Sequence, residues 1–237
     1  KNAENEIILT TDADCILPKT WIETMLSYFD EETQMVCGAV GSIKPNTFIE
    51  KIFALEFSSL IVSGAASIGF GHSSFCNAAN MGFRLGAYQR VKNKIEGQHL
   101  ASGDDVFLLH SISKEYGEKS IKFAYNTNSV VLTRQVSNFR DFINQRVRWG
   151  SKSTSYKKIF PIFTALVVAL INISLICLLI FGIFEVKYFK LFIVLFLLKL
   201  ISDFTLLKLG KILIEPKPSI LVSITTSILY PIYICIT

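Results

Sequence analysis

The stretch Ile7-Ile8-Leu9-Thr10-Thr11-Asp12-Ala13-Asp14 decides how this chain folds, because an apolar run leads directly into two aspartates one residue apart. The run predicts a buried β-strand, which places the aspartates at its carboxyl end. In an open α/β sheet, ligands bind at that edge. Proteins hold Mg²⁺ through one or two carboxylates together with the phosphates of a substrate. The stretch therefore favours a metal and diphosphate site at Asp12 and Asp14, although a solvated turn would explain the same two residues.

Two later segments carry polar residues that suit the same chemistry. Ser102-Gly103-Asp104-Asp105 precedes an apolar helical run. The free N–H groups and dipole of a helix N-terminus stabilise a carboxylate, so capping explains one of these aspartates but does not require both. Gln145-Arg146-Val147-Arg148-Trp149 lies just ahead of a block of hydrophobic segments. The chain thus contains three short motifs in a defined order.

In their order, spacing and position before hydrophobic segments, these motifs resemble those of the family 2 glycosyltransferases. That family comprises membrane-bound inverting enzymes and includes the cellulose, chitin and hyaluronan synthases. Its motifs are a DxD, an acidic pair that ends in the catalytic base, and a QxxRW. The matching residues are, in chain order, Asp12 and Asp14, then Asp104 and Asp105, then Gln145, Arg148 and Trp149.

The resemblance implies a fold and a role for each acidic residue. The implied fold is a partial GT-A type α/β domain, a Rossmann-like nucleotide-diphospho-sugar transferase, followed by transmembrane α-helices. Asp12 and Asp14 would hold Mg²⁺ or Mn²⁺, which neutralises the departing diphosphate. Asp105 would be the general base of a single displacement that inverts the anomeric centre, and Asp104 would support it.

The QxxRW segment is implied to close the site. Trp149 would stack near the acceptor sugar, because an indole presents a flat apolar face to a sugar ring. Gln145 and Arg148 would lie near the diphosphate, because a guanidinium makes bidentate bonds to phosphate. Arg146 lies outside the matched set, and we expect it to face lipid head groups.

Residues 77–84 resemble the GANMAFR-type segment that lines the acceptor side of the pocket in this family. Ala78 or Ala79 stands where the family has its leading glycine. The resemblance therefore implies that Asn80 contacts the acceptor substrate.

Composition separates a globular part from a membrane-like part. The 237 residues are 51% hydrophobic with a mean hydropathy of +0.44 and a net charge of +5, which is too apolar for an ordinary soluble domain of this length. Residues 159–184 are uncharged and long enough to span a membrane. Lys199 and Asp203 interrupt a second candidate span, residues 188–207, at an i,i+4 spacing that lets them neutralise each other. Residues 218–237 are a third candidate, cut off by the end of the sequence.

These patterns predict three parts of the chain. Residues 1–136 form the C-terminal part of the catalytic domain, and residues 159–237 form a transmembrane region of about three helices. Between them, residues 137–158 predict an amphipathic helix at the membrane interface, with an apolar stripe beside arginines and lysines. A nucleic-acid patch is the alternative for these basic residues, and we reject it because membrane segments follow at once. The positive-inside rule then places the catalytic domain on the cytoplasmic side of an integral (cytoplasmic or inner) membrane protein.

The ends and cysteines of the chain add two expectations. It opens with Lys1 at the strand that carries the acidic pair, so we interpret it as an internal fragment that lacks the first strands of the nucleotide-binding half. Five cysteines show no CxxC pair and no zinc spacing, which fits a reduced, cytoplasmic setting.

Periodicity and turn residues place the remaining elements. The pattern predicts helices after Pro18, over residues 47–62, after Asp104 and from Asn138, where Asn138 and Asp141 are spaced as a cap. A Gly-, Ala- and Ser-rich connection is expected over residues 63–74. Predicted strands cover residues 35–40, 121–125 and 129–133.

The sequence therefore predicts a membrane-bound inverting glycosyltransferase. Its partners would be a nucleotide-diphospho sugar donor, a glycan or lipid acceptor and membrane lipids, with no nucleic acid. Transfer of a single sugar to a lipid acceptor is the alternative to polysaccharide synthesis. A non-catalytic membrane scaffold would have no chemical need for Asp12, Asp14, Asp105 and Trp149, and a transporter would leave the acidic motifs unexplained.

Overall fold

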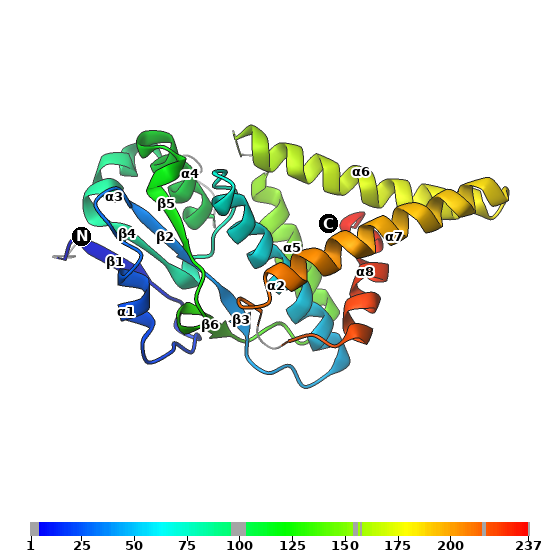
Figure 1. Ribbon diagram of the computed structural model, residues 1–237, viewed down its shortest axis with the longest axis horizontal. Helices are drawn as coiled ribbons and strands as arrows, with labels where there is room; N and C mark the ends of the chain where they lie inside the picture. Colours follow the sequence, from blue (N-terminus) through cyan, green and yellow to red (C-terminus); the bar gives the residue numbers. More distant parts are fainter. Residues whose placement is uncertain (1–4, 96–102, 154–155, 157, 215–216, 237) are drawn as a thin grey trace.

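The computed structural model describes residues 5–95, 103–153, 156, 158–214 and 217–236. A mixed β-sheet with short helices forms one end of the molecule, and a group of long apolar helices extends from the other (Figure 1). Ser102, which precedes the predicted acidic pair, and Lys157, in the predicted interface helix, lie outside the described residues.

The main sheet has the strand order β1-β4-β2-β5. Strand β4 is antiparallel to its neighbours β1 and β2, and β2 is parallel to β5. The prediction that β1 is a buried strand is wrong for the described residues, because β1 lies at one edge of this sheet and is only half-buried. The strands of the sheet are β1 (Ile7–Thr10), β2 (Met35–Gly38), β4 (Met81–Arg84) and β5 (Ile121–Ala124).

The strand predicted over residues 35–40 divides between two sheets. Its first part is β2, and its last residue begins β3 (Val40–Ser42), which pairs in parallel with β6 (Val131–Thr133). Asn80 lies against this division, since a Cβ atom at Gly38 would meet its Nδ2 atom at 2.4 Å. A residue larger than glycine therefore does not fit where the chain passes from one sheet to the other.

Short helices cover the main sheet. Their apolar residues form a core with the strands, in which Met35, Leu109 and Ile112 are completely buried. The helices are α1 (Trp21–Leu26), α3 (Leu85–Val91) and α4 (Asp104–Tyr116), and the single 3₁₀ turns are η1 (Ala78–Asn80), η2 (Lys92–Lys94), η3 (Glu118–Ser120) and η4 (Thr127–Ser129).

Helix α2 (Phe48–Gly69) lies between the sheet and the long helices (Figure 1). It begins at a capping box, in which the Thr47 hydroxyl accepts from the backbone of Glu50 and the Glu50 carboxylate accepts in return. The expectation of a connection from residue 63 is wrong, because the helix continues through residue 69. The small residues serve close packing there, since a Cβ atom at Gly64 would lie 3.1 Å from Phe75.

Four helices follow the sheet. Asn138 caps the first of them as predicted, since its Oδ1 accepts from the backbone N–H of Asp141 at 2.9 Å. The second and third form a long antiparallel hairpin, and the fourth packs beside α2 (Figure 1). They are α5 (Phe139–Ser153), α6 (Ile159–Gly182), α7 (Val186–Leu209) and α8 (Ile220–Ile234).

Among the described residues, two helices are long and apolar enough to cross a membrane, namely α2 and α6. In α2, 61% of the most apolar window is buried inside the molecule, whereas the corresponding share in α6 is 11%. Helix α2 is therefore a core helix, because other parts of the protein bury most of its apolar residues. Helix α7 has the length but carries charges along it, and α8 has only 15 residues.

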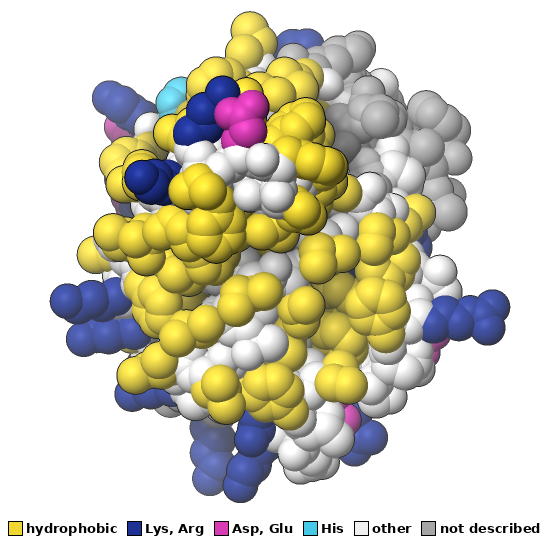
Figure 2. Space-filling view, turned by 90° about the vertical axis from the view of Figure 1, so that its right-hand side faces the viewer, with side chains coloured by type: hydrophobic (Ala, Val, Ile, Leu, Met, Phe, Trp, Pro, Cys, Tyr) yellow, Lys and Arg dark blue, Asp and Glu magenta, His cyan; other side chains and the backbone are white. Residues whose placement is uncertain are grey.

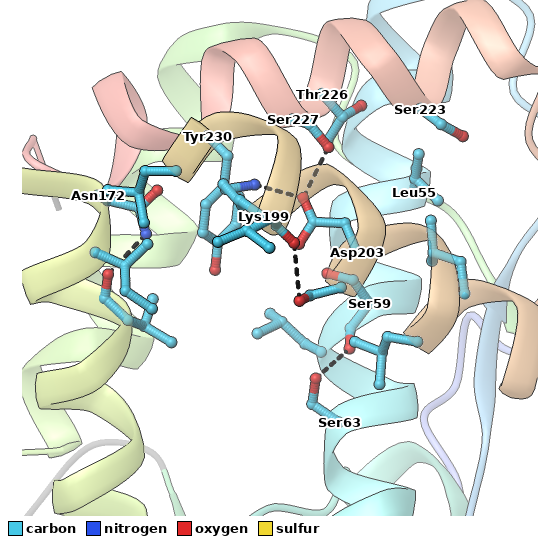
Figure 3. Close-up of a pocket in the computed structure, with 18 residues that line it drawn as sticks. Leu55, Ser59, Ser63, Asn172, Lys199, Asp203, Ser223, Thr226, Ser227 and Tyr230 are labelled. Carbon is cyan, nitrogen blue, oxygen red and sulfur yellow. Dashed lines mark hydrogen bonds and ion pairs between the residues drawn. The ribbon is translucent and has the colours of Figure 1, made fainter. Parts of the chain in front are cut away.

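Lys199 and Asp203 of α7 form the i,i+4 ion pair that their spacing predicts. The hydroxyl of Ser227, on α8, also donates to the Asp203 carboxylate, at 2.8 Å. Figure 3 shows this group between the long helices. The charges of Lys199 and Asp203 thus neutralise each other between α7 and α8.

Candidate active site

The acidic pair lies just after β1, with both carboxylates exposed. A turn follows the strand, in which the N–H of Cys15 donates to the carbonyl of Asp12 at 3.1 Å. This turn brings ligand atoms of Asp12, Asp14 and Cys15 within 4.8 Å of one another. The hydroxyl of Thr133, at the end of β6, lies 3.3 Å from Oδ2 of Asp14. Local sequence therefore collects two carboxylates, and the second sheet adds a hydroxyl.

The donor atoms of this group suit a hard divalent cation. Burial, together with the nearby negative charges, raises the pKa of the Cys15 thiol. Sulfur is a soft ligand, whereas hard divalent cations prefer oxygen. The carboxylate oxygens of Asp12 and Asp14 remain as ligands. Oxygen ligands are those that Mg²⁺ and Mn²⁺ prefer over softer metals. The residues present therefore fit such an ion.

Asp105 lies in the first turn of α4 and is half-buried. Its Oδ2 accepts a hydrogen bond from the backbone N–H of Ala78, in η1, at 3.1 Å. The carbonyl of Ala78 accepts in turn from the hydroxyl of Thr10, the last residue of β1, at 2.7 Å. Asp105 is thus joined through η1 to the strand end that carries Asp12. Asp104, its neighbour, is exposed to solvent.

Tyr156 lies near Asp105, which sequence reasoning did not anticipate. Its ring contacts Phe107 and His110 of α4 edge-on, at centroid distances of 5.8 and 5.3 Å. Burial raises the pKa of Tyr156 to about 12, and the negative charge of Asp105 adds to this rise. The phenol therefore stays neutral at physiological pH beside the candidate base. No local pattern marks Tyr156, because its partners lie more than 40 residues earlier.

Asn80 is completely buried, and both of its polar side-chain atoms are bonded inside the protein. Its Nδ2 donates to the carbonyls of Ala39 and Ser129 at 2.7 and 2.6 Å, and its Oδ1 accepts from the indole N–H of Trp21 at 3.0 Å. The buried amide of Asn80 is therefore not exposed to an acceptor substrate, contrary to the expectation. Asn80 instead fixes the backbone of η1, from which Ala78 donates to Asp105.

Arg146 is buried, contrary to the expectation that it faces lipid head groups. Its Nε donates to the Glu56 carboxylate of α2 at 2.8 Å, and both side chains are almost completely buried. The guanidinium lies 4.7 Å from the ring centroid of Phe142 and 4.4 Å from that of Trp149. The hydroxyl of Tyr233, on α8, donates to the same carboxylate at 2.8 Å. The sequence pattern missed this network because Glu56 precedes Arg146 by 90 residues.

The three residues of the predicted QxxRW motif lie on the same helix. Gln145 accepts a hydrogen bond from Nη1 of Arg146 at 2.7 Å, and Arg148 is exposed. Trp149 packs on Phe57, with centroids 5.9 Å apart. The indole belongs to one apolar cluster with Cys15, which follows Asp14, and with Ala79, which follows Ala78. The structure thus brings α5 close to the segments that carry the acidic residues.

Comparison with known proteins adds one positive result. No curated protein matches the chain. The family model described as Glycosyl transferase family group 2 matches residues 7–202. This match begins at β1, contains all three motifs and ends within α7. The chain therefore belongs to the glycosyl transferase family group 2, whose members are transferases that use a nucleotide-sugar donor and a glycan acceptor.

Proposed function

We propose that this protein is a membrane-bound inverting glycosyltransferase with a GT-A type catalytic domain. It moves a sugar from a nucleotide-diphospho sugar to a hydroxyl of a polysaccharide or a lipid-linked glycan. One observation carries the proposal most strongly. Asp105 bonds to η1, and η1 bonds to the strand end that presents Asp12 and Asp14. A candidate base and a candidate metal site therefore share one edge of the fold.

Asp12 and Asp14 would hold the divalent cation. A bound Mg²⁺ or Mn²⁺ would supply positive charge for the departing diphosphate. Both carboxylates are exposed, so a sugar nucleotide can approach them from solvent. Thr133 holds Asp14 in place through its hydroxyl.

Asp105 would act as the general base. Its carboxylate takes the proton of the acceptor hydroxyl while that oxygen forms a bond to the anomeric carbon. The bond from this carbon to the diphosphate oxygen breaks, and its electron pair leaves with the diphosphate. A single displacement of this kind inverts the configuration at the sugar. The bond from Ala78 holds the Asp105 carboxylate toward η1.

Helix α5 would close the site. Arg148 is exposed and can make bidentate bonds to a phosphate, and Gln145 lies one turn earlier on the same helix. Trp149 offers an apolar ring face for the acceptor sugar. Its position is held by Arg146, which lies between Phe142 and Trp149. The buried partner Glu56 keeps this arginine in place.

The membrane part of the proposal rests on the exposed surface of the long helices. Hydrophobic side chains cover much of the face shown in Figure 2. Most lysines and arginines lie at its margins, and a basic and an acidic side chain lie together in its upper part. Exposed apolar patches of this extent mark interaction with a membrane or another protein. The proposal includes three further points. The chain divides into catalytic domain, interface helix and transmembrane region at residues 136/137 and 158/159. The protein is an integral membrane protein, and its catalytic domain lies on the cytoplasmic side.

Two finer alternatives remain within it. A polymerising enzyme of the cellulose, chitin or hyaluronan synthase kind and an enzyme that adds one sugar to a lipid acceptor would use the same acidic residues. A non-catalytic scaffold would not need Asp12 and Asp14 exposed beside a tethered Asp105. The cavity described below favours a lipid acceptor.

The proposal is tested by hydrolysis and transfer of sugar nucleotides by the full chain in nanodiscs, with Mg²⁺ or Mn²⁺. Asp12→Asn or Asp14→Asn should abolish metal-dependent turnover, because each removes half of the carboxylate pair. Glu32→Gln, at another exposed acid, is the matched control and should keep full activity. Full turnover by either aspartate variant in the presence of a chelator would overturn the proposal.

A further inference from the structure

A cavity of about 330 Å³ lies among α2, α6, α7 and α8, outside the motif residues (Figure 3). Its size is at the lower end of the range for small-molecule pockets. Leucines form much of its wall, together with Val168 and Ile171. Polar groups line it from every helix: Ser59, Ser63, Asn172, Lys199, Ser202, Asp203, Ser223, Thr226, Ser227 and Tyr230.

Asn172 of α6 has an unsatisfied acceptor in this wall. Its side chain is 2% exposed, and its Nδ2 donates to the carbonyl of Val168 at 2.7 Å. Within the part of the chain that the structure describes, its Oδ1 atom has no hydrogen-bond partner. Buried polar atoms are nearly always bonded, and one that is not needs an explanation. A bound molecule that brings a donor would supply the missing bond.

The serine and threonine hydroxyls around the cavity already donate their protons inside the protein. Most donate to backbone carbonyls of their own helices, and one donates to Asp203. A hydroxyl has one proton but two lone pairs, so these oxygens face a ligand mainly as acceptors. The hydroxyls in question belong to Ser59, Ser63, Ser202, Ser223, Thr226 and Ser227. The wall therefore selects a ligand with several donors.

The charge of the cavity is balanced. Lys199 pairs with Asp203, and its Nζ lies 5.1 Å from the ring centroid of Tyr230. Lys199 is almost buried and Asp203 is about one-third exposed. An anionic ligand would have to compete with the Asp203 carboxylate for the lysine and would lie beside that like charge, which is unfavourable. A neutral ligand leaves the pair intact. Its donors can be hydroxyl groups, and its apolar part can lie against the leucines.

We propose that this cavity binds an uncharged lipid with a hydroxylated head group, such as an acylglycerol, whose hydroxyl donates to Oδ1 of Asn172. The inference rests on the proposed function in naming this lipid as an acceptor for sugar transfer. It does not depend on that function for binding itself. An anionic phospholipid is the competing occupant that the experiment distinguishes.

The test uses the full chain in nanodiscs and a dioctanoylglycerol that carries a photoactivatable diazirine in one acyl chain. After irradiation, mass spectrometry should find the label on peptides of α6 and α7, and unlabelled dioctanoylglycerol should compete. Asn172→Leu removes the acceptor and should lower labelling about tenfold, the contribution of one hydrogen bond. Thr164→Val is the matched control on the same helix. It removes a hydroxyl that bonds to its own helix outside the cavity, and labelling should not change.

A second variant covers the case in which Asn172→Leu fails to fold. Ser63 is exposed at the cavity wall, so Ser63→Phe should fill the space from outside and lower labelling in the same way. Unchanged labelling in a folded variant, or equal competition by dioctanoyl phosphatidate, would overturn the inference. Lipid labelling without any use of sugar nucleotides would sink only the proposed function. Metal-dependent hydrolysis without labelling would sink only the lipid site.

Discussion

Two regions of this molecule contain carboxylates in opposite surroundings. After β1, Asp12 and Asp14 are exposed, and only weak donors, the Thr133 hydroxyl and the Cys15 thiol, bond to Asp14 within the described residues. Between α2, α5 and α8, Glu56 is 2% exposed and bonds both to Arg146 and to Tyr233. In the first region the carboxylates are accessible to a ligand. In the second, the Glu56 carboxylate is already paired with protein side chains.

The difference separates charges that a ligand can reach from charges that stabilise the fold. Removing a charge from water is costly, so a buried carboxylate persists only with a permanent partner, and loss of that partner destabilises the fold. An exposed carboxylate has no such cost and can exchange water for a cation. Asp105 lies between these extremes, half-buried and held by the backbone N–H groups of Ala78 and Val106. That intermediate position suits a group that must accept a proton.

The largest expected effect comes from Asp105→Asn. The amide keeps the size of the side chain but cannot take the proton of the acceptor, so transfer should fall by roughly 10² to 10⁴, the usual contribution of a positioned base. Folding and donor binding should survive. Transfer rates and donor affinity measure this directly. Asp104→Asn is the adjacent control at an exposed site, and a greater loss from that change would mean that the base is assigned to the wrong residue.

The next effect is on stability, from Arg146→Met. This change leaves Glu56 charged and buried without its partner, which should lower the free energy of unfolding by about 3–5 kcal/mol. Denaturant titration in mixed micelles measures this change.

The matched control is Arg90→Met, which breaks the exposed Arg90–Glu115 pair of α3 and α4. It should leave the unfolding free energy nearly unchanged, because water replaces the lost partner. If the two variants were equally stable, the contrast between buried and exposed charges would not hold in this protein.

The smallest effect is a change in acid stability, from Asp30→Asn. Bonds from Lys122 and then from Thr33 lower the pKa of the exposed Asp30 carboxyl below its ordinary value of 3.8. A lowered pKa in the folded state contributes stability that is complete above the ordinary value and is lost as the pH falls through the folded value. The variant should therefore lose less stability over that acid interval than the parent does. Thermal melting at a series of acid pH values tests this, with Glu31→Gln as control, and parallel curves for parent and Asp30→Asn would contradict it.

Features with local causes were predictable from the sequence. The cap at Asn138 and Asp141 and the pair of Lys199 and Asp203 both formed, because three or four residues of helix bring such partners together whatever the rest of the chain does. The turn after β1 collects Asp12 and Asp14 for the same reason. The family match over residues 7–202 supports the general reaction that these motifs suggested.

Predictions failed where distant residues decide the outcome. The glycines and alanines of residues 63–69 suggested a connection, but Phe75 packs against Gly64 and the segment is helical. Arg146 looked like a surface arginine on an amphipathic helix until Glu56 supplied a buried partner. Asn80 matched a family segment, yet its amide donates to the carbonyls of Ala39, between β2 and β3, and of Ser129, in η4.

Local sequence was therefore enough to propose which residues carry the chemistry, because a carboxylate pair after a strand or at a helix start depends only on neighbouring residues. Tertiary structure alone decided which charges are accessible and which are buried. It joined Asp105 to β1 through Ala78, placed Glu56 beside Arg146, and left the Oδ1 atom of Asn172, a residue of the cavity wall, without a partner among the described residues. Burial and partner choice depend on residues brought together from far apart along the chain, and no local pattern records them.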